Sequence, residues 1–365
     1  DQGLGFDLAM HLGTLVAVLA YFRHDVARLW QAWVQSMTRG RRDGDVAMAW
    51  GLLLATMPAI AFGLILGLVG ESMLRIPGVI ATTSIVFGIA LNGDARAYPK
   101  RILAWHEMAL DRVGDVELTI VYCTLCGTVI PFESVTNNRH HKFGTSGLLY
   151  RSNKLMFDHE TRSLWNTFKG VPVIGPLANS GLQLTPHAVV TTTWGEWKTN
   201  HPATTVLSLD TGYRRNYGEG AAYRSYFSTD ALMFQVSNTD HRLMNKEQVL
   251  VMQLDDLDSE AQLPLAISVN FLSNNRLFSH RFAGRNLIVV TSEKGASRVY
   301  DANDNRFVRR GSNEKIIDDT GRQWQVTEEA LVLESNPNER RLRLPTQRAF
   351  WFGWYAQFPN TSLIQ

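Results

Sequence analysis

Residues 84–99 read SIVFGIALNGDARAYP, and this stretch separates two parts of the chain. The Asn92-Gly93 pair lies between two extended-looking runs, which is the strongest short-range pattern for a β-hairpin. The pattern predicts Ile85–Leu91 as the first strand of a water-soluble domain. We therefore expect a membrane-helix segment over residues 1–83 and a globular domain over residues 84–365.

The segment before this hairpin contains long runs without charge. Residues 46–70, VAMAWGLLLATMPAIAFGLILGLVG, carry no charged side chain. A helix of this length, at ~1.5 Å per residue, would exceed the ~30 Å of bilayer hydrocarbon. The run therefore predicts a transmembrane helix. Residues 8–22 are also uncharged but short, and residues 76–91 fall below the roughly 20 residues that a span needs.

The loop between the first two apolar runs predicts an orientation. Residues 23–45 contain five arginines and three aspartates, and such a basic excess favours the cytoplasmic side of the membrane. Within it, apolar residues recur at helical spacing, which suits a helix lying on the membrane surface: Val26, Leu29, Trp30, Trp33, Val34 and Met37. We expect the following domain on the outer, periplasmic face of a bacterial plasma membrane, and the lipid bilayer as a partner.

The first part resembles bacterial undecaprenyl-diphosphate phosphatase, of the bacitracin-resistance family. The residues that carry the resemblance are HLGT at 11–14, ATMPA at 55–59 and the apolar runs around them. The resemblance covers about residues 1–83 and implies a membrane hydrolase that acts on a polyprenyl diphosphate, with a polyprenyl lipid or other membrane helices as partners. The family's E-x-x-x-E, P-x-S-S-T-G-H and G-x-S-R-S motifs do not occur in this chain. No catalytic residue can be carried over, so we expect an inactive fragment.

The residue pattern of the second part is typical of a mainly-β or α+β domain. Short extended runs alternate with turn residues, and the runs lie at 116–122, 128–133, 204–209, 265–270, 286–292 and 298–301. Helical stretches are expected only at 99–111 and 193–200. The predicted fold is therefore N-terminal transmembrane α-helices followed by a mainly-β/α+β globular domain. The charged fraction of 19% and net charge of +2 give no reason to expect nucleic acid as a partner.

The second part resembles a prokaryotic domain family of unknown function, number thirty-one seventy-nine. The resemblance rests on GDARAYPKRILAWHE at 93–107, VYCTLCGT at 121–128 and FGTSGLLYRSNKLMFDHETRSLW at 143–165, with further matches to WFGWYAQFPNTSL at 351–363. It spans nearly all of the soluble part and implies no established activity.

The two cysteines, Cys123 and Cys126, are the leading candidates for chemistry. A C-x-x-C-G turn between two strands resembles half of a zinc site, which would need further ligands such as His106, His140 or His141. Copper(I) could bind with fewer ligands, with Met156 as a thioether donor. A redox dithiol is the second interpretation. A resting disulfide or two buried thiols without function are the alternatives.

The stretch 143–165 offers a weaker candidate site. Tyr150, Asn153, Asp158 and Trp165 could line a pocket, although a turn held by local hydrogen bonds is the simpler interpretation. The aromatic residues at 350–358 predict a closing core strand. The function expected for the chain is a membrane-tethered extracytoplasmic domain with a metal or thiol-redox centre. The alternative is undecaprenyl-diphosphate hydrolysis.

Overall fold

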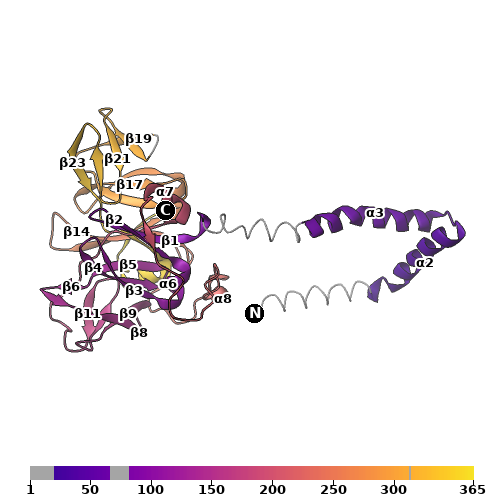
Figure 1. The fold of residues 1–365 in the computed structure, drawn as a ribbon, viewed down its shortest axis with the longest axis horizontal. Coiled ribbons are helices and arrows are strands. Elements are labelled where there is room, and N and C mark those ends of the chain that lie inside the picture. Colours follow the sequence, from indigo (N-terminus) through magenta and orange to yellow (C-terminus); the bar gives the residue numbers. More distant parts are fainter. Residues whose placement is uncertain (1–19, 66–81, 312–313) are drawn as a thin grey trace. The chain divides into compact units, whose positions relative to one another are not determined.

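The computed structural model describes residues 20–65, 82–311 and 314–365, and for 59–65 the backbone alone. The chain divides into two compact units, Asp1–Ile80 and Ala81–Gln365. Figure 1 shows the elements of both units. Each unit is described by itself below.

The described residues of the first unit form helices α2 (Arg23–Arg39) and α3 (Gly44–Ile65). Helix α2 ends at Gly40, whose φ of 67° lets its N–H donate to Gln35 O, as is common after the last turn of a helix. The two helices contact each other through aromatic rings, with the Trp33 and Trp50 centroids 6.2 Å apart. The predicted helical periodicity over residues 26–37 is confirmed by α2.

The predicted transmembrane helices are wrong for the part of the chain that the structure describes. None of the helices there is both long enough and apolar enough to cross a membrane. Helix α3 begins two residues before the predicted span, includes Asp45 in its first turn and contains Pro58 in its interior. Residues 66–70 of the predicted span, and most of the stretches 8–22 and 76–84, lie outside the described residues.

The second unit is built mainly from antiparallel sheets, and its first half contains four of them among the described residues. One sheet has the order β12 (Val190–Thr193), β1 (Ile85–Leu91), β2 (Asp94–Pro99) and β13 (Thr205–Val206). The next is β3 (Met108–Val113), β4 (Val116–Cys123) and β5 (Thr128–Glu133). The third is β11 (Val171–Ile174), β10 (Leu164–Asn166), β9 (Asn153–Asp158) and β8 (Phe143–Tyr150), and β6 (Val135–Thr136) pairs with β7 (Arg139–His140).

Three further sheets form the second half of the unit. One has the order β24 (Gln347–Phe350), β14 (Gln248–Asp255), β15 (Gln262–Ser268) and β25 (Ser362–Ile364). Another contains β16 (Leu277–Phe282), β17 (Arg285–Thr291) and β18 (Ser297–Asp301). The last contains β19 (Phe307–Arg310), β20 (Lys315–Asp318), β21 (Gln323–Val326), β22 (Ala330–Leu333) and β23 (Asn336–Leu342). The short helices are α6 (Lys100–His106), α7 (Trp194–Asn200), α8 (Arg224–Phe227), α9 (Val269–Asn274) and α10 (Trp351–Gln357).

The predicted hairpin at the start of this unit is confirmed. Strands β1 and β2 pair from Val86↔Pro99 to Leu91↔Asp94, and Asn92 and Gly93 both have positive φ, at 50° and 80°. A two-residue turn of this kind requires positive φ at both positions, which Asn and Gly tolerate best. Strand β1 spans Ile85–Leu91 as predicted.

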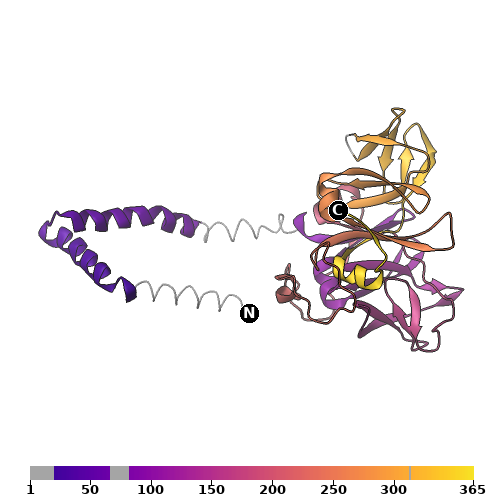
Figure 2. The same cartoon turned by 180° about the vertical axis from the view of Figure 1, so that it is seen from behind.

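Two predicted elements differ from the structure. The helix expected over 99–111 ends at His106, because Glu107 takes a positive φ of 59° and the chain then continues as β3. The aromatic segment expected as a strand is helix α10, with only Phe350 in a strand. Trp351, Trp354 and Phe358 are spaced so that a helix turns all three toward one core, and Figure 2 shows the yellow α10 among strands from the first half of the unit.

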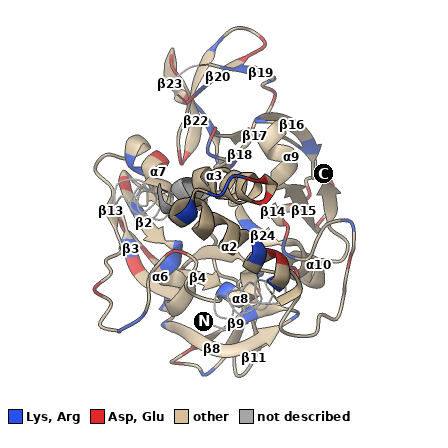
Figure 3. Cartoon of the chain, turned by 90° about the vertical axis from the view of Figure 1, so that its right-hand side faces the viewer, with Lys and Arg blue, Asp and Glu red and all other residues tan. Residues whose placement is uncertain are grey.

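Strand β4 lies between two hydrophobic cores. This position buries Cys123, the last residue of the strand. Val121 faces a core that includes Trp165 and Trp354, whereas its neighbour Tyr122 faces a second core with Phe87. Successive side chains of a strand point to opposite faces, so β4 is buried on both. Acidic and basic residues are interspersed over the elements in the view of Figure 3.

Candidate functional site

The two cysteines lie in the turn that joins β4 to β5. Cys123 ends β4 opposite Thr128, the Cys126 N–H donates to Cys123 O at 3.2 Å, and Gly127 completes the turn with a φ of 64°. The two sulfurs form a disulfide, with the Cα atoms 5.3 Å apart. The tight turn predicted from the sequence is confirmed, and the cysteines are present in their oxidised form.

Both cysteines are buried, but not equally. Cys126 is 0% exposed and Cys123 is 3% exposed. Cys126 O accepts from the Phe350 N–H at 2.7 Å, and a Cβ added to Gly353 would lie 3.3 Å from Cys126 Cβ. The start of α10 is therefore packed directly on Cys126, and Cys123 is the only one of the pair with any exposure.

A carbonyl oxygen lies beside the inner sulfur. Ser152 O is 3.0 Å from Cys126 Sγ. A disulfide sulfur has no proton to donate, so in the oxidised form this is a close contact. A reduced Cys126 thiol could donate a hydrogen bond to the same oxygen. The site therefore holds an acceptor for the thiol that reduction would create.

Helix α8 covers the outer side of the turn. The Tyr226 hydroxyl donates to Leu125 O at 2.9 Å, and Lys246 Nζ lies 3.6 Å from the centroid of the Tyr226 ring. Lys246 also donates to Thr229 O at 2.6 Å and to Ala231 O at 2.7 Å. These contacts connect α8 to the segment before β14 and hold the helix over the C-T-L-C turn; α8 is called the cover below.

A buried ion pair lies beside the same turn. Lys154 Nζ donates to Glu107 Oε2, and the Lys154 side chain is almost fully buried. Burial lowers the pKa of Lys154, and the Glu107 carboxylate opposes this shift. Glu107 O accepts from the Tyr122 N–H at 2.8 Å. The ion pair therefore connects Tyr122, which precedes Cys123, with Lys154 in β9. No motif in the sequence indicated this pair, and a lysine within an apolar strand was the only signal.

His106, a predicted candidate for a metal or redox site, lies beside two tyrosine rings. Its Nε2 is 2.5 Å from the Tyr217 hydroxyl, and its ring contacts those of Tyr213 and Tyr217. Burial, together with Arg215, lowers the pKa of His106. In the described ranges no group of three or more His, Cys, Asp or Glu side chains could hold a metal ion. The zinc or copper site remains a prediction for the reduced state of the cysteines.

The four predicted pocket residues fall into two pairs: Tyr150 is paired with Asn153 across β8 and β9, and Asp158 and Trp165 both contact His141. Tyr150 lies partly exposed at the end of β8 and lines a cavity of about 450 Å³. Trp165 is fully buried in the core, and Asn153 is buried with neither amide atom hydrogen-bonded. Asp158 is buried and accepts from His141. The structure therefore does not gather these side chains in one pocket.

His141 and Asp158 form a buried pair. His141 Nδ1 lies 2.9 Å from Asp158 Oδ2, and the Trp165 ring packs edge-on against the imidazole at 5.2 Å. Burial alone would raise the pKa of Asp158, but hydrogen bonds from Thr161 and His141 outweigh it and lower that pKa. His141 was considered only as a metal ligand in the sequence, and its partner 17 residues away was not anticipated.

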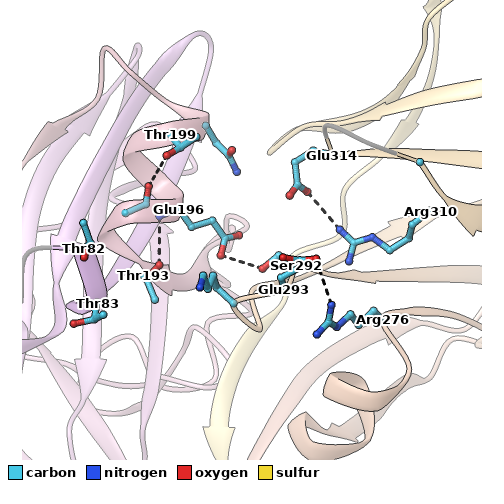
Figure 4. A pocket seen from close by; sticks show the side chains of 14 residues that line it. Thr82, Thr83, Thr193, Glu196, Thr199, Arg276, Ser292, Glu293, Arg310 and Glu314 are labelled. Atoms are coloured by element: carbon cyan, nitrogen blue, oxygen red, sulfur yellow. Dashed lines mark hydrogen bonds and ion pairs between the residues drawn. The ribbon is translucent and has the colours of Figure 1, made fainter. Parts of the chain in front are cut away.

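The largest cavity described, about 710 Å³, lies elsewhere in the unit. It is bounded by α7, the turn between β17 and β18, and the hairpin of β19 and β20, and Figure 4 shows its charged and hydroxyl side chains. Neither cysteine lines it. No motif in the sequence indicated this site, because its residues come from five separate segments of the chain.

Comparison with known proteins identifies both parts of the chain. The family model "Bacitracin resistance protein BacA" matches residues 1–127. The chain is 50% identical over 91 residues to an undecaprenyl-diphosphatase of Saccharophagus degradans, and 45% identical over 91 residues to that of Nitrosococcus oceani. Each alignment covers 25% of this chain and 34% of the relative. The chain thus spans about a third of the length of the curated relatives it matches.

The second part matches the family model "Protein of unknown function (DUF3179)" over residues 72–361. No solved structure matches the chain. Both resemblances stated from the sequence are confirmed. Because this second match covers most of the chain, the protein belongs to the DUF3179 family, with an N-terminal region similar to part of undecaprenyl-diphosphatase.

Proposed function

We propose that the second unit is an extracytoplasmic thiol–disulfide centre in which Cys123 and Cys126 alternate between a disulfide and a dithiol. The observation that carries this proposal is the disulfide across the C-T-L-C turn. Disulfides persist in oxidising compartments and are rare in the bacterial cytoplasm. A three-residue separation also lets one cysteine displace a partner from the other without rearrangement of the fold.

The surroundings of the two cysteines favour different roles for their sulfurs. A thiolate from a reducing partner would attack Cys123 Sγ, since Cys126 is sealed by Phe350 and Gly353. The S–S bond breaks, and its electron pair leaves on Cys126 Sγ, which takes a proton and can donate it in a hydrogen bond to Ser152 O. A second thiolate then attacks the partner's sulfur in the mixed disulfide, releasing Cys123 as a thiol and the partner as its own disulfide.

Access to Cys123 requires movement of the cover. The hydrogen bond from Tyr226 to Leu125 O is the direct contact between α8 and the turn. A helix of four residues within a long irregular segment opens at lower cost than a core strand. Exchange should therefore be slow with the native cover and faster when this contact is removed.

We further propose that the first unit contacts the bacterial membrane, with the second unit on the outer side. The resemblance to a membrane-enzyme family supports this location. Exposed apolar side chains on both helices also support it, among them Trp30 on α2 and Leu54 and Met57 on α3. Such side chains favour an apolar environment over water.

A redox titration of the full-length protein tests the proposed centre. Equilibration in thiol–disulfide buffers, followed by alkylation and mass spectrometry, gives the reduction potential of the pair. We expect a two-electron transition above about −300 mV, since structural disulfides of secreted proteins lie below that value. A lower potential would identify the bridge as structural.

Single substitutions test the assigned roles. In Cys126→Ser, Cys123 should attack a small symmetric disulfide and form a stable mixed disulfide, releasing the other half of the reagent as a thiol, because no second thiol in the chain can displace the bound half. Cys123→Ser should react with the same disulfide much more slowly at Cys126. Equal trapping by the two variants would contradict the assignment. Elemental analysis of the reduced protein and of Cys123→Ser tests zinc or copper binding at the same pair.

A second candidate function is hydrolysis of undecaprenyl diphosphate. It is favoured by the identity of 50% over 91 residues to an undecaprenyl-diphosphatase. Phosphate release from this lipid by the purified full-length chain in detergent would support the candidate. No release above that of a boiled sample would remove it.

A further inference from the structure

The cavity bounded by α7 contains one buried carboxylate with an unsatisfied oxygen. Glu196 lies in the first turn of α7, where its N–H donates to the Thr193 hydroxyl at 3.3 Å. Its side chain is 9% exposed and lines the cavity. Figure 4 shows this carboxylate extending from α7 toward the loop that carries Ser292.

The two oxygens of Glu196 have different partners. Oε2 accepts from the Ser292 hydroxyl at 3.0 Å. Oε1 is buried and has no hydrogen-bond partner, and the nearest cation, Arg298 NH1, lies 3.9 Å away. A buried carboxylate oxygen without a donor costs stability. A ligand that brings an N–H donor to Oε1 would remove this cost.

The rim of the cavity is cationic and only loosely neutralised. Arg276 NH1 is 3.8 Å from Glu293 Oε1, and Arg310 NH2 is 4.0 Å from Glu314 Oε2, so neither pair is within hydrogen-bond distance. Lys294 lines the same rim. Guanidinium and ammonium groups of this kind bind carboxylates and phosphates.

The layer behind the cavity adds positive charge. Arg298 and Arg343 share the single carboxylate of Glu328. Arg348 donates to Gly295 O, in the loop that forms part of the cavity wall, and to Gln248 Oε1, neither of which is charged. Two buried guanidinium groups, those of Arg298 and Arg343, and the partly buried Arg348 thus lie near two carboxylates, those of Glu328 and Glu196. The local excess of positive charge favours a ligand that carries an anionic group.

We propose that this cavity binds a small zwitterion of the peptide type, with its ammonium group on Glu196 Oε1 and its anionic group facing Arg276, Lys294 and Arg310. A volume of about 710 Å³ lies within the roughly 300–1,000 Å³ of small-molecule sites and leaves room for a dipeptide with side chains. The proposal does not depend on the redox centre, because the cavity wall contains neither cysteine.

The test uses three peptides that differ only at their ends. Isothermal titration of the full-length protein at pH 7 compares alanyl-alanine with N-acetyl-alanyl-alanine and with alanyl-alanine amide. We expect saturable binding of alanyl-alanine and at least tenfold weaker binding of each capped form. Absence of binding for all three, or equal binding of the free and acetylated peptides, would overturn the proposal.

Variants connect the peptide ends to named side chains. Glu196→Gln should weaken alanyl-alanine binding at least tenfold while leaving the acetylated peptide unchanged, so that the difference between the two peptides disappears. Glu260→Gln, in the exposed turn between β14 and β15, is the matched control and should bind as the wild type does. If Glu196→Gln does not fold, Arg276→Gln on the rim provides the second test, since it should remove the preference for the free carboxylate over the amide. An unchanged preference in these variants would contradict the assigned contacts.

Discussion

Replacing Glu328 by glutamine should destabilise the second unit strongly. Arg298 donates to Glu328 Oε1 through Nε at 2.8 Å and through NH2 at 2.5 Å, and Arg343 NH1 donates to Oε2. All three side chains are at most 5% exposed. Glutamine removes the only carboxylate hydrogen-bonded to both guanidinium groups and places an NH2 group against one of them. Breaking a buried pair in this way costs about 3–5 kcal/mol.

The neighbouring residue provides a matched control. Glu329 accepts hydrogen bonds from the Asn92 N–H and Arg340, but its side chain is 41% exposed. Exposed ion pairs contribute about 0–1 kcal/mol. Glu329→Gln makes the same chemical change one position along the chain, so it measures what the substitution does without burial.

The two effects should be separable by calorimetry. The second unit spans Ala81–Gln365, and about 2.1 cal/mol/K per residue gives it an unfolding entropy of about 0.6 kcal/mol/K. A loss of 3–5 kcal/mol then lowers Tm by about 5–8 °C, against less than about 2 °C for Glu329→Gln. Equal Tm values for the two variants would refute the reasoning that burial makes the Glu328 cluster a stabilising network.

Three further predictions follow from the described contacts. Burial would raise the pKa of Glu328, but Arg298 and Arg343 outweigh it and hold that pKa far below its usual 4.5. The carboxylate therefore stabilises the fold fully above about pH 5, and urea unfolding should show this stability decreasing as the pH falls below about 4, with a flatter profile in Glu328→Gln. The Cys123–Cys126 disulfide closes a loop with a separation of only three residues. Its reduction should therefore lower the free energy of unfolding by about 2 kcal/mol in the chain-entropy description. A decrease above about 4 kcal/mol would indicate a larger structural role. Gly88→Ala would place a Cβ 2.3 Å from the Trp197 ring. Denaturant unfolding should therefore show a decrease of at least about 1–3 kcal/mol in the free energy of unfolding. An unchanged midpoint would mean that β1 and α7 move apart to accommodate the methyl group without cost.

Local features of this fold were predictable from the sequence. The Asn92-Gly93 hairpin and the C-T-L-C turn follow from backbone conformations that only a few residue types accept, and both are present. The strand at 128–133 was also predicted from its β-branched and aromatic residues. These preferences act over a few neighbouring residues, which is why a single sequence reveals them.

Hydropathy and aromatic spacing were less reliable guides. The uncharged run at 46–70 predicted a membrane span, but the described part of α3 lacks the combined length and hydropathy. The segment at 350–358 predicted a strand, but residues 351–357 form helix α10, which turns Trp351 and Trp354 toward one core. Apolar content alone does not distinguish a buried strand from a short helix, because both can present the same residues to a core.

The sequence by itself determined that Cys123 and Cys126 meet in a tight turn, since three residues of separation leave them no other arrangement near a hairpin. Only the tertiary structure decided which sulfur is sealed, because Phe350 in β24 and Ser152 in the turn between β8 and β9 reach Cys126 from elsewhere in the chain. The same holds for the cavity at Glu196, whose partner Ser292 lies 96 residues away. Such contacts depend on the order in which sheets stack, and that order is set by the burial of whole faces rather than by any short motif.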